Sequence, residues 1–493
     1  MSVYNPEPNP GLRRNHFRKV CENGFGDRYN GYAYSMAWFN DHLYVGTSRA
    51  NLCLLKFAMP FVTMDYWPVE CPYFNYTPEF EHQCARGEIW SFNPLLNHWN
   101  RVYQSPLITD AEGVEFSRDL GYRGMTVFQG KSDSKPALYV STWSRSRGTG
   151  PDILRSEDGK TFITTPKPRF MTQGRDITVT AIRVLVSFKG KLYTAPTGAA
   201  KGNVNASGIS LVYESDDPAV GNWRCVNEPG FGQLPDVMTI YEMAVLGDYL
   251  YAGTAGLSGF QIWRTDAEGV PPYRWEKVIT NGAERGALNQ GPSSMISFKG
   301  ALYIGTGIQN GGYDHRNKIG PAASEIIRLH PDGSWDIVVG TARNGKKSLS
   351  GLGPGFNNYF CGYLWRMGIY EDWLYAGTMD WSLILRYVKL EEKPLKVARM
   401  IAALGVEEFI KNNGGSALWR TYDGENWLPV TQNGFKNPYN YGIRNIVPTP
   451  HGLFIGTANP FGPRAAIRTN KKQWEWTYED NPDGGLEVWQ GVF

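Results

Sequence analysis

The ten residues DHLYVGTSRA, at positions 41–50, contain the phrase that decides the fold. They read as a tight turn, a short strand and a loop. Variants of LYVGT return six more times: ALYVST ending at Thr142, KLYTAPTG beginning at Lys191, YLYAGT ending at Thr254, ALYIGT ending at Thr306, WLYAGT ending at Thr378 and GLFIGT ending at Thr457. Seven copies spread over the whole chain indicate a repeat architecture.

Each copy lies in a larger unit that predicts four strands. An apolar strand such as SSMISF and a turn precede the phrase, and a strand such as ALWRT, a DG turn and a strand such as NWLPVTQNGF follow it. The shortest spacing, from Leu250 to Leu302, is 52 residues, which is the size of a four-stranded propeller blade.

The two ends of the chain complete each other. The last residues, GGLEVWQGVF, match the third strand of a unit, and HFRKVCENGFG near the N-terminus matches the missing fourth strand. The repeat therefore resembles a seven-bladed β-propeller, broadly similar to the kelch and WD-repeat classes. This resemblance implies an all-β fold: one domain over residues 1–493, four antiparallel strands per blade, and an N-terminal strand that completes the last blade. The WD dipeptide and the kelch glycine pair do not recur, so neither class's partners transfer.

Three insertions interrupt the repeat, at about residues 58–86 in blade one, 308–324 in blade five and 389–413 in blade six. The spacing of Val397, Met400, Ile401 and Leu404 predicts an amphipathic helix in the third. The first is rich in Tyr, Phe and Pro. A lid over the channel, a flap on a blade edge and a dimer contact all remain open for it.

Composition excludes several classes of protein. Fifty basic residues against 47 acidic ones give a formal net charge of +3, which does not indicate a nucleic-acid binder. No stretch is long and apolar enough for a membrane helix. The N-terminal MSVYNPEPNPGLRRNHF lacks the apolar core of a secretory signal, so a cytoplasmic protein is expected. The six cysteines form no C-x-x-C pair; free buried thiols are expected, with a Cys71–Cys84 bridge as the alternative.

Aligned on the repeated phrase, the innermost strands share one position near the channel mouth. Its occupants are Tyr34, Arg123, Arg183, Tyr241, Ser293, Trp365 and Arg444. Guanidinium groups among aromatic rings predict a vestibule that attracts anions. The alternative is that these side chains tie blades together, with Asp119, Asp176, Asp236 and Asp380 as buried partners of the arginines.

The residue types in the vestibule favour acid–base and electrostatic chemistry without a cofactor. The expected protein is an enzyme of specialised metabolism, of cyclase, alkylating, lyase or isomerase type, on a small aromatic or anionic metabolite. Catalysis is assigned to Tyr34, Arg123, Tyr241, Asp380 and Arg444. Substrate binding is assigned to Arg49, Tyr122, Trp143, Arg145, Arg183, Asp236, Tyr363, Trp365, Trp381, Tyr439 and Tyr441.

The alternative function is a non-catalytic module that grips a glycan, a peptide or a partner enzyme with the same face. The mouth loops differ from blade to blade, which favours one central pocket over a site in every blade. The expected partner is a small molecule, with a homodimer or a partner enzyme left open. The seven histidines do not gather in the mouth loops, so no catalytic metal is predicted, although a structural calcium in the channel remains open.

Overall fold

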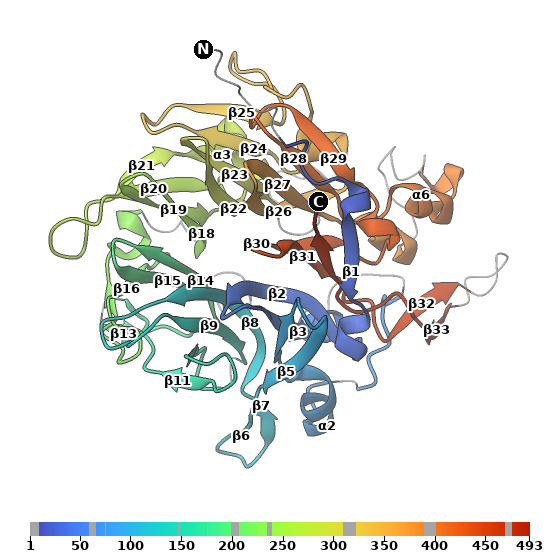
Figure 1. Ribbon diagram of the computed structural model, residues 1–493, viewed down its shortest axis with the longest axis horizontal. Coiled ribbons are helices and arrows are strands. Elements are labelled where there is room, and N and C mark those ends of the chain that lie inside the picture. The colour runs from blue at the N-terminus through green and yellow to red at the C-terminus, as the bar shows by residue number, and fades with distance from the viewer. Residues whose placement is uncertain are drawn as a thin grey trace.

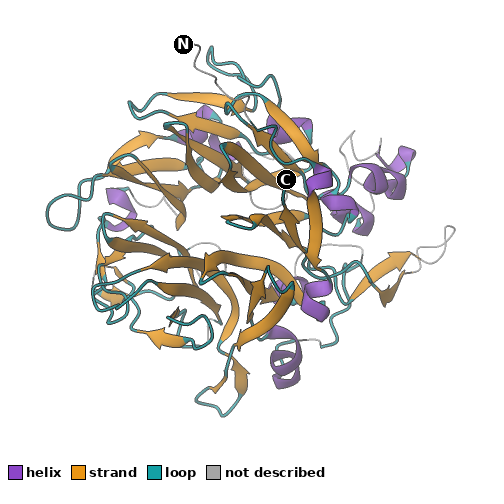
Figure 2. Ribbon diagram, in the orientation of Figure 1, coloured by secondary structure: helices purple, strands orange, loops and turns teal. Residues whose placement is uncertain are grey.

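The computed structural model describes residues 9–58, 66–73, 75–145, 148–172, 174–198, 207–233, 239–308, 322–388, 401–468 and 476–493. The predicted site residue Asp236 and parts of all three predicted insertions lie outside these ranges. Within them the chain is mainly β-strand, arranged around a centre as in a β-propeller (Figures 1 and 2).

Each repeat of the sequence folds into four antiparallel strands, and the LYVGT phrase is always the second of them. Unit one is β2 (Asn30–Phe39), β3 (His42–Arg49), β4 (Glu88–Asn93) and β5 (His98–Gln104). Unit two is β8 (Asp119–Phe128), β9 (Ala137–Ser144), β10 (Ile153–Ser156) and β11 (Ile163–Thr165). Unit three is β14 (Ala181–Phe188), β15 (Lys191–Thr197), β16 (Tyr213–Ser215) and β17 (Arg224–Cys225). Unit four is β18 (Thr239–Leu246), β19 (Tyr249–Ala255), β20 (Gln261–Thr265) and β21 (Glu276–Ile279).

The remaining units follow the same order. Unit five is β22 (Gly291–Phe298), β23 (Ala301–Gly307), β24 (Ile326–Leu329) and β25 (Trp335–Val339), and unit six is β26 (Cys361–Tyr370), β27 (Trp373–Asp380), β28 (Leu418–Thr421) and β29 (Trp427–Thr431). The seventh is β30 (Gly442–Thr449), β31 (Gly452–Ala458), β34 (Val488–Gly491) and β1 (Phe17–Cys21). As the sequence predicted, β1 from the start of the chain pairs with β34 at its end, with Phe17 opposite Gly491.

The first strands of the units face the centre and touch one another in a cycle. β2 contacts β8, β8 contacts β14, and the contacts continue through β18, β22, β26 and β30 back to β2 (Figure 1). Hydrogen bonds join neighbouring units at this level. Asn445 Nδ2 of the seventh unit donates to the Ala33 carbonyl of the first at 2.5 Å, and Ser35 Oγ of the first donates to the Tyr122 carbonyl of the second at 2.8 Å.

The glycine and threonine of the LYVGT phrase have separate structural roles. A Cβ at Gly377 would lie 2.4 Å from Ile443 Cγ2 of the next unit, so the glycine lets adjacent units pack closely. The threonine hydroxyl accepts the N–H that begins the third strand: Thr47 accepts from Glu88 at 3.0 Å, and Thr457 accepts from Glu487 at 2.8 Å. The glycine makes this close approach in units one, four, five, six and seven, whereas Ser141 and Ala195 take its place in units two and three.

The other elements lie outside the four-stranded units. They are the hairpins β6 (Leu107–Thr109) with β7 (Glu115–Ser117), β12 (Met171–Thr172) with β13 (Arg175–Asp176), and β32 (Arg464–Arg468) with β33 (Trp476–Asp480), and the helices α1 (Asn51–Ala58), α2 (Pro78–Phe80), α3 (Asn281–Glu284) and α6 (Val406–Asn413). Helix α6 lies within the third predicted insertion. No helix in the described ranges is long and apolar enough to cross a membrane.

One disulfide bond is present, and it differs from the pairing weighed in the sequence. Cys71 bonds to Cys53, with their Cα atoms 5.6 Å apart, while Cys84 is a buried free thiol. Helix α1 begins directly after β3 and brings Cys53 beside Cys71, a proximity that sequence spacing does not indicate. The bridge fastens helix α1, which precedes the first insertion, to the middle of that insertion.

Candidate functional site

Every first strand carries a β-bulge at the same height. Its register against the second strand shifts across one residue in each unit, for example between Ala33 and Ser35 in β2 and between Ile443 and Asn445 in β30. The residues at the seven shifts are Tyr34, Arg123, Arg183, Tyr241, Ser293, Trp365 and Arg444. A bulge sets two residues of one strand against one of its partner and re-aims the side chains there. The row predicted from the sequence is therefore a ring of bulges.

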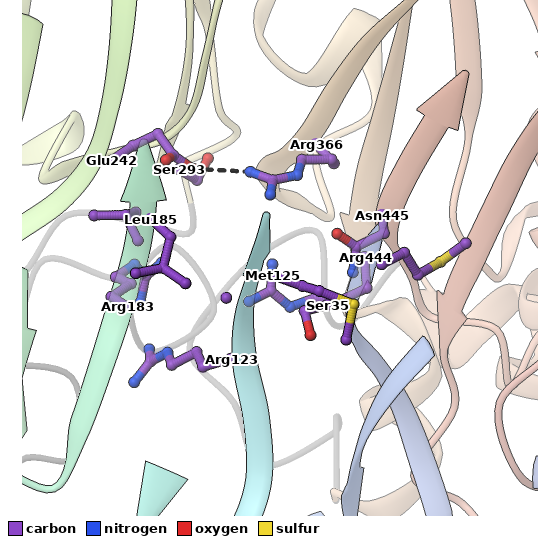
Figure 3. A pocket seen from close by; sticks show the side chains of 13 residues that line it. Ser35, Arg123, Met125, Arg183, Leu185, Glu242, Ser293, Arg366, Arg444 and Asn445 are labelled. Carbon is purple, nitrogen blue, oxygen red and sulfur yellow. Dashed lines mark hydrogen bonds and ion pairs between the residues drawn. The ribbon is translucent and has the colours of Figure 1, made fainter. Parts of the chain in front are cut away.

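A cavity of about 60 Å³ lies in the channel at this ring. Figure 3 shows the four arginines that surround it, Arg123, Arg183, Arg366 and Arg444. Glu242 is the one carboxylate among the described lining residues, and it accepts a hydrogen bond from Arg366 Nη1 at 2.8 Å. The cavity is therefore electropositive.

Aromatic rings alternate with these arginines and hold them by cation–π contact. The Arg444 guanidinium lies 5.1 Å from the ring centroids of both Tyr34 and Trp365. Tyr34 also faces Arg123 at 5.7 Å, and Arg183 lies over Tyr241 at 4.1 Å. Cation–π contacts thus connect Arg123, Tyr34, Arg444 and Trp365 in one group and Arg183 with Tyr241 in another.

Burial affects the two deepest arginines. Arg123 and Arg444 are each 7% exposed. Burial lowers the pKa of Arg444 to about 9, with the nearby Arg183 adding to the effect, and it lowers the pKa of Arg123 to about 10. Because a guanidinium stays protonated at neutral pH, each side chain carries a positive charge that is poorly solvated.

The carboxylates expected to neutralise these arginines have other partners. Asp119 is buried against Arg118, 2.8 Å away, and Asp176 pairs with Arg169 at the surface, also at 2.8 Å. Arg183 Nε donates to the backbone carbonyl of Tyr241 at 2.6 Å, so this arginine does tie unit three to unit four. Asp119 and Asp176 therefore do not form the predicted staples with the arginines of the channel, and Asp236 lies outside the described residues.

More aromatic side chains lie on the mouth side of the ring. Tyr32 and Tyr441 share a hydrogen bond between their hydroxyl groups, and Trp365 lies 5.8 Å from Tyr441 and 5.9 Å from Tyr363. Trp143, at the end of β9, lies 6.1 Å from Tyr34. These five residues, Tyr32, Trp143, Tyr363, Trp365 and Tyr441, form what we call the aromatic mouth.

Several predicted site residues hold the scaffold together instead. Arg49 is buried, bonds to Asp27 at 2.7 Å and donates to the Cys84 carbonyl at 3.2 Å. Tyr122 is fully buried between units one and two. Arg145 pairs with the buried Glu81. The contacts of Arg49 and Arg145 join the first insertion to the units, and all three side chains are occupied away from the cavity.

Asp380, Trp381 and Tyr439 lie toward helix α6. Both oxygens of the buried Asp380 are engaged: one accepts from Ser382, and the other accepts from Asn358 Nδ2 at 2.6 Å. Burial raises the pKa of this carboxyl group to about 6. Trp381 packs on the ring of Phe360 at 4.8 Å, and Tyr439 accepts a hydrogen bond from Arg386 at 2.9 Å. The structure does not place these residues on the cavity.

Sequence reasoning missed Glu242 and Arg366, which line the cavity and pair across it. Each directly follows a residue of the predicted row, Tyr241 or Trp365. If side chains alternated strictly along the strand, Glu242 and Arg366 would point to the opposite face from Tyr241 and Trp365. The bulge removes that alternation and admits both neighbours to the channel. Repetition of a bulge in every unit was the signal that could have found them.

No family model and no curated protein sequence matches the chain. The similar solved structures include glycoside hydrolases and a prolyl endopeptidase. An ancestral GH74 enzyme matches with a TM-score of 0.47 and 10% sequence identity, and the match covers 94% of this chain and 48% of that enzyme. A GH74 xyloglucanase from Xanthomonas campestris matches with a TM-score of 0.41 and 13% identity, covering 94% of this chain and 56% of the xyloglucanase. A GH43 arabinoxylan arabinofuranohydrolase from Bacillus subtilis matches with a TM-score of 0.33 and 12% identity, covering 71% of this chain and 76% of that enzyme.

The chain spans about half the length of the two GH74 enzymes. Two predictions are wrong in view of these comparisons: the enzyme of specialised metabolism acting on a small aromatic or anionic metabolite, and the small-molecule partner. The xyloglucanase and the arabinoxylan arabinofuranohydrolase among the similar structures are named for carbohydrate polymers instead. The described residues contain no group of three His, Cys, Asp or Glu side chains that could hold a metal ion.

Proposed function

We propose that this protein is a glycan-binding β-propeller, in which the seven four-stranded units are the blades of one closed ring and the carbohydrate binds at the aromatic mouth. The cyclic contacts of the first strands and the pairing of β1 with β34 support the ring. The proposal rests on the side chains of this channel rather than on the distant solved structures.

The observation that carries the proposal is a set of aromatic rings beside hydrogen-bond donors. One face of a sugar ring presents C–H groups that pack on an indole or phenol, and its hydroxyl groups need polar partners. Trp365 and Tyr363 stack at 29° between their planes, with the guanidinium of Arg444 next to Trp365. The mouth therefore offers both kinds of contact in one place.

The same geometry favours binding over hydrolysis. Glycoside hydrolysis in most families uses two carboxyl groups on opposite sides of the scissile bond. Among the described residues that line the cavity, Glu242 is the single carboxylate, and Arg366 holds it at 2.8 Å. Asp380 is buried and hydrogen-bonded elsewhere. We therefore propose a lectin-like role.

Calorimetric titration with a panel of oligosaccharides tests this function. We expect at least one saccharide to bind, and Trp365→Ala to weaken it by about tenfold or more because an indole face is lost. Tyr249→Ala is the matched control: this side chain is 38% exposed and begins β19, where it pairs with Leu246 at the end of β18 that lies away from the bulge. Failure of every saccharide to bind, or equal binding by the two variants, would contradict the proposal.

A further inference from the structure

We infer that the four arginines of the channel receive the acidic group, a carboxylate or a sulfate, of a charged saccharide whose ring lies on the aromatic mouth. This inference rests on the proposed glycan binding. It names the class of glycan, which the comparisons do not.

The first support is the charge balance of the cavity. Four guanidinium groups line it, and Glu242 is the one carboxylate among its described lining residues. That carboxylate is already engaged by Arg366. Like charges gathered in a poorly solvated space repel one another, and an oxyanion from outside would offset this repulsion. A neutral sugar would leave it in place.

The second support is an unused donor. Arg444 is 7% exposed, and its Nε atom is buried with no hydrogen-bond partner among the described residues. A buried donor without a partner is costly, and such groups in folded proteins usually mark a missing ligand or water. A guanidinium can also bind a carboxylate or sulfate through two parallel hydrogen bonds, which a lysine could not do.

The third support is size and position. The cavity of about 60 Å³ has room for about four water-sized groups, since one water needs roughly 10–15 Å³. An acidic head group of a few heavy atoms fits this volume. Along the strands, Tyr32 and Tyr363 precede the bulge on the mouth side, while Met36 and Met125 line the cavity beyond it. The ring would stay at the mouth and its acidic group would reach inward.

The arginines are also held ready for an anion. The stacks of Arg444 on Tyr34 and Trp365, and of Arg183 on Tyr241, limit the freedom of these side chains before a ligand arrives. Groups fixed in advance lose less entropy on binding. A site held in this way is suited to one kind of oxyanion carrier rather than to diffuse surface attraction.

Matched oligosaccharides provide the test. Neutral, carboxylate-bearing and sulfate-bearing forms of the same glucan, xylan and galactan oligomers are titrated against the intact protein at low and high salt, with inorganic sulfate as a further ligand. We expect at least one acidic form to bind about tenfold or more tightly than its neutral counterpart, with affinity falling as salt rises. Whether the carboxylate or the sulfate is preferred identifies the acidic group.

Two variants locate the effect. Arg444→Met and Arg183→Met should each weaken binding of the acidic form by about tenfold more than binding of the neutral form, because the charge contact is lost only for the acidic form. Arg169→Met, at a surface side chain that is 71% exposed, is the control and should change neither. Using two channel variants keeps the test valid if one fails to fold.

The outcomes separate this inference from the proposed function. Equal binding of neutral and acidic forms overturns the inference and leaves glycan binding standing. Binding of no saccharide overturns both. Retained preference for the acidic form in both channel variants places the acidic group elsewhere and overturns the inference. If inorganic sulfate binds as tightly as the acidic saccharide, the channel is a simple ion site that does not recognise the sugar. This outcome also overturns the inference.

Discussion

Replacing Arg444 with methionine should stabilise the ligand-free protein. The pKa of this guanidinium falls from 12.5 to about 9 on folding, chiefly because of burial. Each pKa unit corresponds to about 1.4 kcal/mol, so keeping the group charged inside the fold costs at most about 5 kcal/mol. Methionine has a similar reach and no charge, but it forfeits the two cation–π contacts, which contribute about 1–2 kcal/mol together. We expect a net gain of about 1–4 kcal/mol, the range typical when a buried ion gives way to an apolar residue.

Urea unfolding in low-salt buffer measures this gain. The control Arg169→Met removes an exposed ion pair and should change the unfolding free energy by less than about 1 kcal/mol. An anion that binds the native channel should stabilise the unmodified protein by about 2.7 kcal/mol at one hundred times its dissociation constant, and should stabilise Arg444→Met, which binds it about tenfold more weakly, by only about 1.4 kcal/mol at the same concentration. If Arg444→Met loses stability well beyond the control, the guanidinium is a net structural staple and the reasoning is refuted.

Three further predictions concern the scaffold. Burial raises the pKa of Asp380 from 3.8 to about 6, so this carboxyl group loses its proton at a lower pH in the unfolded chain than in the folded protein. The unfolding free energy should therefore fall by about 3 kcal/mol as the pH rises from about 4 to above about 6. Urea unfolding should show a flatter dependence of the unfolding free energy on pH for Asp380→Asn, and parallel dependences in the two proteins would contradict the prediction. The Cys53–Cys71 bridge spans 18 residues, so Cys53→Ser should lower the unfolding free energy by about 3 kcal/mol. Alkylation followed by mass spectrometry should find four free cysteines in the unmodified protein. Finding six, as a reducing compartment such as the predicted cytoplasm would favour, would refute the bridge. Phe17→Ala should lower the unfolding free energy by about 3–5 kcal/mol, because this ring is 5% exposed and anchors β1. Phe493, which is 54% exposed, is the control and should tolerate alanine. Equal effects of the two substitutions on thermal unfolding would argue against the role of β1.

Much of the fold could be predicted because its determinants are local. The alternation within LYVGT, the turns around it and the recurring order of strands are all visible within about 50 residues of chain. The pairing of β1 with β34 was also predictable, because the two ends of the chain each carry half of a recognisable unit. Repetition supplied seven independent copies of one pattern, and the same repetition aligned the row of residues that forms the ring in the channel.

The electrostatic outcome in the channel depended on contacts between units that are distant in the chain. Glu242 and Arg366 pair across 124 residues of sequence, and neither stood in the predicted row. Sequence alternation failed at the bulges, where a strand shows two successive residues to the channel. The partners of Asp119, Asp176 and Asp380, and of Cys71, could not be read from spacing either.

The sequence by itself thus determined the repeated unit, the order of its strands and the set of guanidinium and aromatic side chains at one height of the channel. Only the tertiary structure decided which of these charges are neutralised and which face the cavity. The physical reason is range: strand and turn preferences act between near neighbours in the chain, whereas ion pairing, burial and the shape of a cavity depend on atoms that folding brings together from different units.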